Sequence, residues 1–414
     1  MIKEAIILAG GLGTRLKEAV PDLPKCMAPV AGRPFLFYVI NYLRSQGSEK
    51  FIFSLGYKHH FIEDYLKDKF ETLIYDIVIE NEPLGTGGAV QLALSKAKEE
   101  NIVVINGDTL FKVNLIEAQK FHISNNAECT LLLKPMQNFE RYGVVELTNG
   151  QRVKSFKEKQ FYSEGTINGG LYILNRKKFL DKIFPAKFSF EKDYLEQFYT
   201  EKNIYGIVQD EYFIDIGIPE DFNRVQSELS QPPLDLHKID NSWTLFLDRD
   251  GVINEDKVGS YIFHKDEFKF MQGAPDFFKR LSEKFGHIIV VTNQRGIGRE
   301  LMTEEHLTGI HDKMNEAIVT AGGKIHGIYF ASSIANNHPL RKPNPGMAFK
   351  AKTDFPMIDL AKSIMVGNKL SDMLFGKNAG MYTVFIASTN PEVAFPHPDI
   401  DLRFELLQDF AKAL

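Results

Sequence analysis

The sequence is poor in cysteine, in tryptophan and in long apolar runs. Of 414 residues, two are cysteine (Cys26 and Cys129) and one is tryptophan. Two thiols exclude a disulfide-rich secreted scaffold and a multi-cysteine zinc site, and they suit a reducing compartment. No stretch approaches the ~20 apolar residues of a membrane-spanning helix, and the first apolar run is too short for a signal peptide. We therefore expect a cytoplasmic protein without a membrane partner.

An excess of positive charge is also missing. The formal net charge is −5, with 44% hydrophobic and 25% charged residues. These values are typical of a soluble globular protein and argue against a nucleic-acid partner that binds a basic surface. A chain of 414 residues exceeds one ordinary core, so two or more domains are expected. The oligomeric state stays open, a homo-oligomer included.

What the sequence does contain is a regular alternation of strand-like and helix-like segments. Such alternation predicts a doubly wound α/β sheet, whose ligands gather at the carboxyl ends of the strands. From residue 127 to 156 the pattern becomes richer in β-structure. In this first half the apolar runs predict strands at 51–55, 73–80, 102–106, 130–133, 143–147 and 169–174. The helical patterns cover 35–46, 87–98 and 219–229.

A proline-containing polar stretch then separates two halves. Residues 230–241 favour a linker, although a long surface loop within one domain has a similar composition. The alternation restarts directly afterwards, so we expect an α/β domain at 1–229 and another at 242–414. The second half is predicted to hold strands at 244–247, 287–291, 325–330, 363–366 and 383–386 with helices between them, among them a helix at 274–285.

Phosphate chemistry is suggested first by a glycine-rich loop. Gly10, Gly11 and Gly13 follow an apolar run, and Arg15 and Lys25 come soon after. A loop of this kind can point backbone N–H groups at a phosphate, and the two cations can neutralise it. Taken alone, the same residues favour a tight turn and two solvated cations, so the phosphate interpretation depends on the motifs that follow.

Two carboxylates far apart in sequence extend this hypothesis. Asp108 and Asp215 each follow an apolar run, so both are expected at the ends of strands. Hard oxygen ligands at such a place suit Mg²⁺, particularly when triphosphate oxygens complete its coordination. Either residue alone would more often be a helix cap or a turn residue.

The first half resembles the sugar-1-phosphate nucleotidylyltransferases. The likeness rests on six stretches in order: 8–16 with 24–25, 82–89, 106–108, 156–159, 168–170 and 215–217. Within that family it is nearest to the heptose-1-phosphate guanylyltransferases, through the block from Gly85, 141–143 and 213–221. The resemblance implies that an oxygen of a sugar 1-phosphate attacks the α-phosphorus of a nucleoside triphosphate and that pyrophosphate leaves.

The resemblance also implies roles for single residues. Arg15 and Lys25 would stabilise charge at the α-phosphorus, and Asp108 and Asp215 would hold Mg²⁺. GTP is favoured, because a carboxylate at Glu82 could accept from N1–H and the 2-amino group of guanine. A solvated turn acid is an equally good interpretation of Glu82. Nucleotide contacts would come from Leu8, Gly10, Gly11, Gly13, Thr14, Glu82 and Gly87, and sugar-phosphate contacts from Gly143, Glu158, Lys159 and Asn168.

In the second half, Asp248 and Asp250 directly follow an apolar run. Two carboxylates one residue apart can serve as a nucleophile and as an acid–base group. Together with 291–293, 341–343 and 367–372, they resemble the haloacid dehalogenase phosphatases, among which heptose-1,7-bisphosphate 7-phosphatases and histidinol-phosphatases are the nearest. Asp248 would then form an aspartyl phosphate, and Asp250 would protonate the leaving oxygen and later activate water.

The remaining roles in this half are also implied by the resemblance, with two departures from its pattern. The stretch 367–372 has Asn368 where the family usually has Asp. Residues 332–340 contain no cysteine, unlike the zinc-binding loop of the nearest phosphatases, so no zinc is expected. The short interval from 250 to 292 leaves little room for a large cap. Phosphate would bind to Thr292, Asn293, Arg341 and Lys342, and Mg²⁺ to Asp248, Asp250, Asn368 and Asp372.

Together the halves predict a bifunctional enzyme of nucleotide-sugar synthesis. The phosphatase would remove the 7-phosphate of heptose 1,7-bisphosphate, and the transferase would activate the remaining 1-phosphate with GTP. One alternative is a transferase for another hexose 1-phosphate joined to a phosphatase of different specificity. Another is a non-catalytic second half that only binds a ligand, since Asn368 removes one charge.

Overall fold

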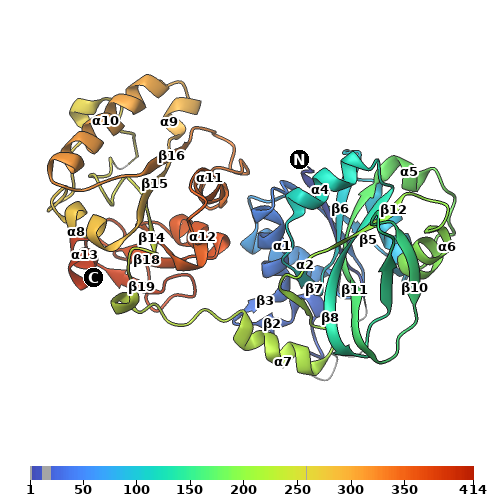
Figure 1. Ribbon diagram of the computed structural model, residues 1–414. Helices are drawn as coiled ribbons and strands as arrows, with labels where there is room; N and C mark the ends of the chain where they lie inside the picture. Colours follow the sequence, from blue (N-terminus) through green and yellow to red (C-terminus); the bar gives the residue numbers. More distant parts are fainter. Residues whose placement is uncertain (1, 12–19, 258) are drawn as a thin grey trace. The chain divides into compact units, whose positions relative to one another are not determined.

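The chain forms two α/β units. The computed structural model describes residues 2–11, 20–257 and 259–414, and the chain divides into Met1–Gln231 and Pro232–Leu414 (Figure 1). We call these unit 1 and unit 2. The division lies within the proline-containing stretch 230–241, which includes the short 3₁₀ helix η4 (Leu236–Lys238).

Unit 1 is built on four parallel strands in the order β6-β1-β4-β5. They are β1 (Glu4–Ala9), β4 (Lys50–Leu55), β5 (Ile74–Ile79) and β6 (Asn101–Asn106). Their continuous apolar runs are what burial on both faces of a sheet requires. Since β1 lies between β4 and β6, the strand order reverses beside β1, and doubly wound sheets bind ligands at that switch point.

An antiparallel layer continues the sheet beyond β6. The long strand β11 (Tyr162–Asn175) pairs with β6, with β8 (Cys129–Phe139) and, at one residue, with β9 (Val144–Leu147). Its register against β8 shifts between Asn168 and Tyr172. The bulge contains Gly169 and Gly170, and Gly170 has a φ of 66°, which glycine adopts without strain. Outside these pairs, β10 (Val153–Lys157) joins β9, and β12 (Ile204–Val208) runs parallel to β8.

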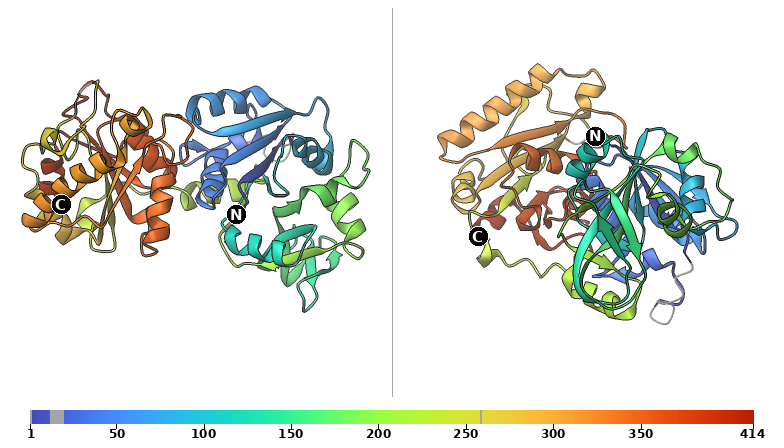
Figure 2. Two further views of the ribbon diagram at one scale, coloured as in Figure 1. Left: turned by 90° about the horizontal axis from the view of Figure 1, so that it is seen from above. Right: turned by 45° about the vertical axis from the view of Figure 1, so that its right-hand side comes forward.

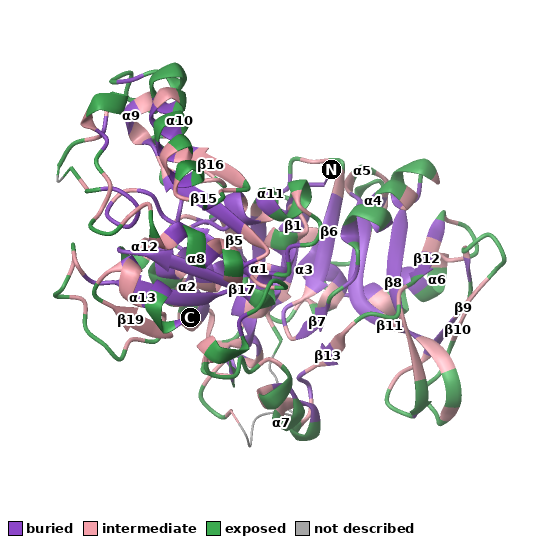
Figure 3. Ribbon diagram, turned by 60° about the vertical axis from the view of Figure 1, so that its left-hand side comes forward, coloured by how far each residue is buried: buried purple, intermediate pink, exposed green. Residues whose placement is uncertain are grey.

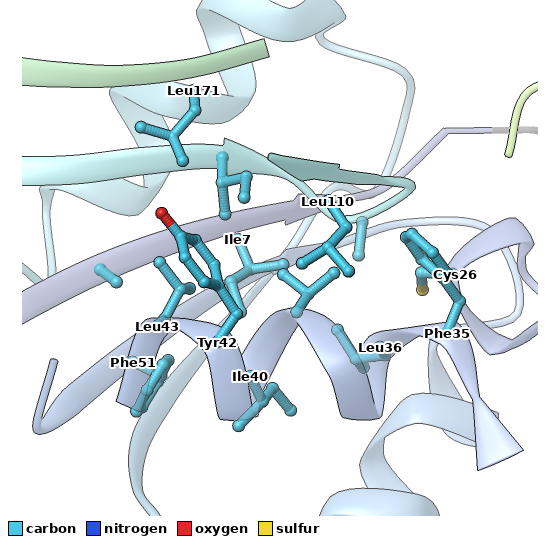
Figure 4. Close-up of a cluster of buried hydrophobic side chains, with 14 of the residues drawn as sticks. Ile7, Cys26, Phe35, Leu36, Ile40, Tyr42, Leu43, Phe51, Leu110 and Leu171 are labelled. Atoms are coloured by element: carbon cyan, nitrogen blue, oxygen red, sulfur yellow. The ribbon is translucent and has the colours of Figure 1, made fainter. Parts of the chain in front are cut away.

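Helices cover both faces of this sheet (Figure 2). Along β1 the side chains alternate: Ile7 joins the apolar cluster under α1 (Phe35–Ser45), α2 (His59–Lys69) and α4 (Leu115–Ser124). Ile6 joins the opposite cluster, with α3 (Gly85–Leu94) and the π-helix η3 (Phe190–Leu195). Figure 4 shows the first cluster, in which Leu36, Ile40 and Leu43 of α1 recur at helical spacing.

Burial follows the same plan. The central strands β6, β8 and β11 are buried along most of their length, whereas the end of the β9–β10 hairpin is exposed (Figure 3). The smaller elements of unit 1 lie around this framework. They are η2 (Lys25–Met27), β2 (Pro29–Val30), β3 (Arg33–Pro34), β7 (Thr109–Phe111), α5 (Arg176–Leu180), α6 (Glu196–Phe198), β13 (Phe213–Asp215) and α7 (Pro219–Glu228).

Unit 2 is a parallel sheet in the order β16-β15-β14-β17-β18-β19. Counted along the chain this is the order 3-2-1-4-5-6 of doubly wound folds, whose switch point lies between the first and fourth strands. Those two strands are β14 (Thr244–Leu247) and β17 (Ser363–Gly367). The others are β15 (His287–Asn293), β16 (Gly327–Ala331), β18 (Tyr382–Ile386) and β19 (Leu402–Phe404).

The helices of unit 2 also divide between two faces. α8 (Phe277–Lys284), α10 (Glu304–Thr320) and α13 (Leu407–Ala413) share one cluster, and α11 (Gly346–Asp354) and α12 (Leu370–Ala379) share the other. The helix expected at 274–285 is shorter than predicted, because α8 begins only after a turn at 272–276. The short segments α9 (Arg295–Gly298), η5 (Lys265–Glu267) and η6 (Leu360–Lys362) complete the unit.

The α/β class predicted for both halves is confirmed. In unit 1, α3 begins two residues before the predicted helix and ends at Leu94, and β8 and β11 are longer than the predicted strands. Within the described ranges, no helix combines the length and apolar character needed to cross a membrane.

Candidate active sites

Three charged side chains meet at the switch point of unit 1. Lys25 Nζ forms a short ion pair with Asp108 and lies 3.4 Å from Asp215 Oδ1. Asp108 follows β6, and Asp215 ends β13, which pairs with β7 so that Asp215 lies opposite Thr109. This two-stranded ladder brings carboxylates together that are 107 residues apart in sequence. Lys25 reaches them from η2.

The two carboxylates compete for one amine. Burial raises the pKa of Asp215, and the nearby charge of Asp108 raises it further. The backbone N–H of Gly217 donates to Asp215 Oδ1 at 2.8 Å, which holds the carboxylate in place. A Cβ at Gly217 would press on both Lys25 Nζ and Asp215 Oδ1, so the absence of a side chain there keeps the site open. The arrangement gathers negative charge that a single lysine does not fully compensate.

The described part of the glycine loop lies beside this centre. Gly10 and Gly11 follow β1, and the N–H of Gly107 donates to the carbonyl oxygen of Leu8 at 2.8 Å. A Cβ on Gly10 would overlap the carboxylate of Glu80. The predicted residues Gly13, Thr14 and Arg15 lie outside the described residues.

Glu80 is a carboxylate that the motifs did not single out. Its Oε1 accepts from Ser54 Oγ and its Oε2 from the N–H of Leu84, each at 3.2 Å. Burial raises its pKa. Glu82, the residue chosen by resemblance, is exposed. The structure therefore places an oriented acid against the glycine loop two residues before the predicted one.

The block after Glu82 forms the start of α3. Gly87 donates its N–H to the carbonyl oxygen of Phe188 at 3.0 Å, and a Cβ on Gly87 would overlap the Phe188 ring. Packing against Phe188 thus gives Gly87 a reason to be glycine that is separate from its predicted contact with the nucleotide.

The predicted sugar-phosphate residues come from three neighbouring strands. Gly143 precedes β9, and a Cβ there would overlap the carbonyl oxygen of Lys157 in β10. Glu158 and Lys159 directly follow β10 and are exposed. Asn168 lies at the β11 bulge, half-buried. These residues belong to the antiparallel layer, whereas the glycine loop belongs to the parallel one.

The two stretches that resembled the heptose enzymes, 141–143 and 213–221, contact each other. Arg141 Nη2 lies 2.6 Å from Asp221 Oδ2, and the rings of Tyr142 and Phe213 meet edge to face with centroids 6.1 Å apart. The antiparallel layer is thereby tied to the segment that carries Asp215.

Unit 2 has a matching centre at its own switch point. Asp248 follows β14, and its Oδ1 lies 2.7 Å from Lys342 Nζ. The same amine lies 2.7 Å from Asp372 Oδ1 and donates to the carbonyl oxygen of Val291 at 3.0 Å. Each of the three charged residues is at most 5% exposed. Burial raises the pKa of Asp248 to about 7, although the Lys342 ammonium opposes this shift.

Asp250 is held differently. Arg249, fully buried, donates to both of its oxygens at 2.9–3.1 Å. Asn254 Nδ2 donates to Oδ1 and Gln294 Nε2 to Oδ2, each at 3.0 Å. Burial alone would raise the pKa of Asp250, but the Arg249 charge and these hydrogen bonds hold it below its usual value. Gln294 Nε2 also donates to Thr292 Oγ1 at 2.8 Å, which links the stretch 291–293 to the Asp250 carboxylate.

The remaining predicted phosphatase residues surround these acids. Asn293 exchanges hydrogen bonds with the backbone of Lys342, at 3.0 Å and 3.2 Å. Arg341 is half-buried, and burial lowers its pKa to about 10, helped by the charge of Arg295. Asn368 Nδ2 donates to Thr389 Oγ1 at 2.7 Å, while its buried Oδ1 has no hydrogen-bond partner within the described residues.

Both centres have donor sets that suit a divalent cation of the hard class. Unit 1 offers two carboxylates that already share one cation. Unit 2 offers Asp248 and Asp372 around Lys342, together with the unpartnered oxygen of Asn368. Such oxygen ligands suit Mg²⁺. Among the described residues no cluster of three or more His, Cys, Asp or Glu side chains forms a metal site, so substrate oxygens and water would have to complete the coordination.

Comparison with known proteins agrees with this division. Residues 4–231 match the family model described as nucleotidyl transferase, and residues 244–399 match the one described as polynucleotide kinase 3 phosphatase. A D-glycero-alpha-D-manno-heptose 1-phosphate guanylyltransferase of Aneurinibacillus thermoaerophilus is 52% identical over 226 residues, which is 55% of this chain and 98% of the relative.

Two further proteins are similar over nearly the same share of the chain. A D-glycero-alpha-D-manno-heptose 1-phosphate guanylyltransferase of Campylobacter jejuni is 43% identical over 219 residues, covering 53% of this chain and 96% of the relative. The crystal structure of HddC from Yersinia pseudotuberculosis complexed with GMP-PN superposes with a TM-score of 0.51 at 37% identity. It covers 55% of this chain and all of that one.

Proposed function

The chain belongs to the nucleotidyl transferase family over residues 4–231 and carries a phosphatase-family domain in unit 2, and from this premise we propose a bifunctional enzyme of heptose nucleotide synthesis. Unit 1 transfers GMP from GTP to D-glycero-α-D-manno-heptose 1-phosphate and releases pyrophosphate. Unit 2 hydrolyses the 7-phosphate of heptose 1,7-bisphosphate. The observation that carries the proposal is the pair Asp108 and Asp215 around Lys25 at the switch point, in a chain 52% identical to a heptose-1-phosphate guanylyltransferase.

In unit 1 the chemistry is mainly the positioning of two anions. An oxygen of the sugar 1-phosphate attacks the α-phosphorus in line, the bond to the pyrophosphate oxygen breaks, and pyrophosphate carries the electron pair away. Asp108 and Asp215 hold Lys25 at the switch point of the sheet. There its ammonium supplies positive charge where the α-phosphoryl oxygens develop negative charge. By the motif, Arg15 has the same role. The backbone at Gly10 and Gly11 receives the nucleotide phosphates.

Two acids are candidates for the contact with guanine, Glu82 by its motif and Glu80 by its geometry. Guanine presents two adjacent donors, N1–H and the 2-amino group, which one carboxylate can accept together. Glu80 is oriented by Ser54 and Leu84 and lies against Gly10. Replacing each in turn by glutamine and comparing the KM for GTP with that for ITP, which lacks the 2-amino group, separates them. The acid that contacts the base is the one whose loss removes the preference for GTP.

In unit 2, Asp248 is the nucleophile. Its carboxylate oxygen attacks the phosphorus of the 7-phosphate, the ester bond to the sugar oxygen breaks, and an aspartyl phosphate forms. Lys342 lies beside both Asp248 and Asp372 and holds phosphoryl oxygens with Thr292. Asp250 is ionised in the free protein because of Arg249. When the phosphoryl dianion binds and raises its pKa, it takes a proton from solvent, which it donates to the leaving oxygen. It then takes a proton from a water molecule whose oxygen attacks the phosphorus; the bond from phosphorus to the Asp248 oxygen breaks, and inorganic phosphate leaves.

Mg²⁺ is the cofactor that we assign to both centres. In unit 1 Asp108 and Asp215 would hold it, and in unit 2 Asp248, Asp372 and the oxygen of Asn368 would, with the carbonyl of Asp250 assigned by resemblance. When bound, it neutralises phosphate charge and lowers the pKa of the carboxylates around it. Within the described residues the buried Oδ1 of Asn368 has no hydrogen-bond partner, which supports its retention as an oxygen ligand for Mg²⁺ despite the lost charge. Both cysteines are buried free thiols, in keeping with the cytoplasm.

The test is a coupled assay on the whole chain. With heptose 1,7-bisphosphate, GTP and Mg²⁺, we expect phosphate and pyrophosphate release and a product with the mass of GDP-heptose. Asp248→Asn should abolish phosphate release but still allow pyrophosphate release from heptose 1-phosphate. Asp215→Asn should do the reverse, so each variant is the control of the other.

Competing substrates decide the specificity. Mannose 1-phosphate and glucose 1-phosphate, each with the common nucleoside triphosphates, test the transferase. A 3′-phosphorylated oligonucleotide is the competing substrate for the phosphatase, chosen because unit 2 matches the family called polynucleotide kinase 3 phosphatase. A higher kcat/KM for any of these than for the heptose substrates would contradict the assignment.

A further inference from the structure

A chain of hydrogen bonds leads away from Asn168 into the interior of unit 1. The backbone N–H of Gly170 donates to Asn168 Oδ1 at 3.1 Å. Asn168 Nδ2 donates to the hydroxyl of Tyr172 at 2.8 Å, and that hydroxyl lies 3.4 Å from Glu191 Oε1. These residues come from the β11 bulge and from the π-helix η3. Their contacts therefore join two segments that are distant in sequence.

The donor and the acceptor of every hydrogen bond in this series are fixed by the chemical groups involved. A carboxylate only accepts, so the single hydroxyl hydrogen of Tyr172 points to Glu191 and its oxygen accepts from Asn168. Tyr172 is 1% exposed, and burial raises its pKa well above the usual value, so the hydroxyl stays protonated. The amide of Asn168 consequently has one orientation, with Oδ1 toward Gly170 and Nδ2 toward Tyr172. Among the described residues its second N–H and the remaining lone pair of Oδ1 make no hydrogen bond, so both are available to a ligand.

Glu191 is itself held from the nucleotide side of the unit. Thr86 Oγ1, in the first turn of α3, donates to Glu191 Oε2 at 2.7 Å and accepts from the N–H of Phe190 at 2.9 Å. Ser189 Oγ donates to the same carboxylate oxygen at 3.1 Å. A π-helical turn is rare and is often retained at functional sites. Here it places Glu191 between the block that begins at Gly85 and the bulge that carries Asn168.

We propose that Tyr172 and Glu191 are positioning residues for nucleotidyl transfer, which set the amide of Asn168 to receive the sugar phosphate. Neither residue contacts the substrate. They fix the orientation of the Asn168 amide, which then presents one donor and one acceptor to the sugar phosphate. Thr86 holds Glu191 in place through its hydrogen bond to Oε2. The inference rests on the proposed transfer to a sugar 1-phosphate and on the role of Asn168 in it.

Tyr172→Phe is the first test, and Tyr194→Phe is its matched control. Tyr194 is a second buried tyrosine that donates to a carboxylate, Glu128, at 3.0 Å, and both rings pack against Phe190. Tyr194 has no hydrogen bond to Asn168. We expect Tyr172→Phe to raise the KM for heptose 1-phosphate about tenfold, the effect of one misplaced hydrogen bond. The KM for GTP should change less than twofold, and Tyr194→Phe should leave both values within twofold.

Glu191→Gln tests the direction of the hydrogen bonds without creating a cavity, because glutamine has nearly the same shape as glutamate. A glutamine amide can donate to Tyr172, whose hydroxyl is then free to turn toward Asn168 and reverse its amide. We expect the same rise in the KM for the sugar phosphate. The double variant with Tyr172→Phe should be no worse than the worse single one, because both act through Asn168. Glu191 is only half-buried, so this variant folds even if Tyr172→Phe does not.

The outcomes separate the two levels of the argument. If the wild-type chain releases pyrophosphate, the inference is overturned when Tyr172→Phe behaves like Tyr194→Phe or when the KM for GTP rises as much as that for the sugar phosphate. If the wild-type chain transfers no nucleotide to any sugar phosphate in the panel, the proposed function fails and the inference falls with it.

Discussion

Replacing Lys342 by methionine removes the cation that lies between two buried acids of unit 2. Asp248 and Asp372 lie 2.7 Å from its amine, and the side chains of all three are at most 8% exposed. Methionine has a similar length and leaves no large cavity. The variant therefore tests electrostatics more than packing. Its effect on the unfolding of unit 2 can be estimated from the geometry.

Removing one partner of a buried ion pair costs about 3–5 kcal/mol. Here the cost depends on pH, because Asp248 has a pKa of about 7 in the folded chain against an ordinary value of 3.8. A raised pKa means that the folded state binds a proton that the unfolded state has lost, so stability falls as pH rises through this window. Loss of the Lys342 charge raises that pKa further. The deficit of the variant should grow above pH 7 by at most ~1.4 kcal/mol per pH unit.

The assay uses a convenient property of the sequence. Trp243 is the one tryptophan of the chain and packs against Tyr382 in unit 2, with ring centroids 5.6 Å apart. Its fluorescence therefore reports the unfolding of unit 2 alone. With a urea m-value of about 2 kcal/mol/M, a loss of about 4 kcal/mol lowers the midpoint by about 2 M at pH 6, and by more at pH 8.

Lys257→Met is the control. Lys257 pairs with Glu267 at 3.1 Å, but the two side chains are 43% and 36% exposed, and exposed pairs contribute at most ~1 kcal/mol. The reasoning is refuted if Lys342→Met lowers the midpoint no more than Lys257→Met, or if its deficit shrinks between pH 6 and pH 8.

Four further outcomes follow from the structure. Gly309→Ala, in the middle of α10 where a Cβ meets no atom within 4 Å, should raise the unfolding free energy of unit 2 by about 0.5–1 kcal/mol, measured by Trp243 fluorescence. Gly87→Ala, whose Cβ would overlap Phe188, should destabilise unit 1 by about 1–3 kcal/mol in calorimetry; an unchanged transition would contradict this packing. Dialysis against EDTA should abolish both activities, and Mg²⁺ should restore them. Asp215→Asn should raise the Mg²⁺ concentration needed by any residual transferase activity but leave that of the phosphatase unchanged.

The sequence was sufficient for the parallel parts of both units. Strands such as β4, β6 and β14 are continuous apolar runs bounded by polar residues, a pattern that is local and therefore visible in the chain. The same pattern located Asp108, Asp248 and Asn368, since each follows directly after such a strand or the glycine that ends it. The fold class was predicted correctly for this reason, whereas the prediction of two enzymatic halves came from the resemblance of their motifs to two families.

What the sequence could not supply is pairing between distant segments. The ladder of β7 with β13 brings Asp108 to Asp215, yet each strand has only three residues and no distinctive pattern. The contacts of Lys342 with two acids and the link of Glu191 to Asn168 are of the same long-range kind. The Glu80 carboxylate was missed because its importance comes from Gly10 lying against it. The start of η3 did have a local signal in the sequence, because Ser189 is a typical helix-capping residue and accepts from the N–H of Lys192.

The bulge in β11 also restricts how this chain can vary in length. On the C-terminal side of the bulge, β11 alternates between two cores: Leu171 and Ile173 belong to one, Tyr172 and Leu174 to the other. Losing a single residue there would exchange the two sets. Gly169 and Gly170 absorb one offset already. We therefore expect natural variants of this protein to gain or lose residues at the exposed turn at 148–151, and to keep β11 at constant length between its bulge and Asn175.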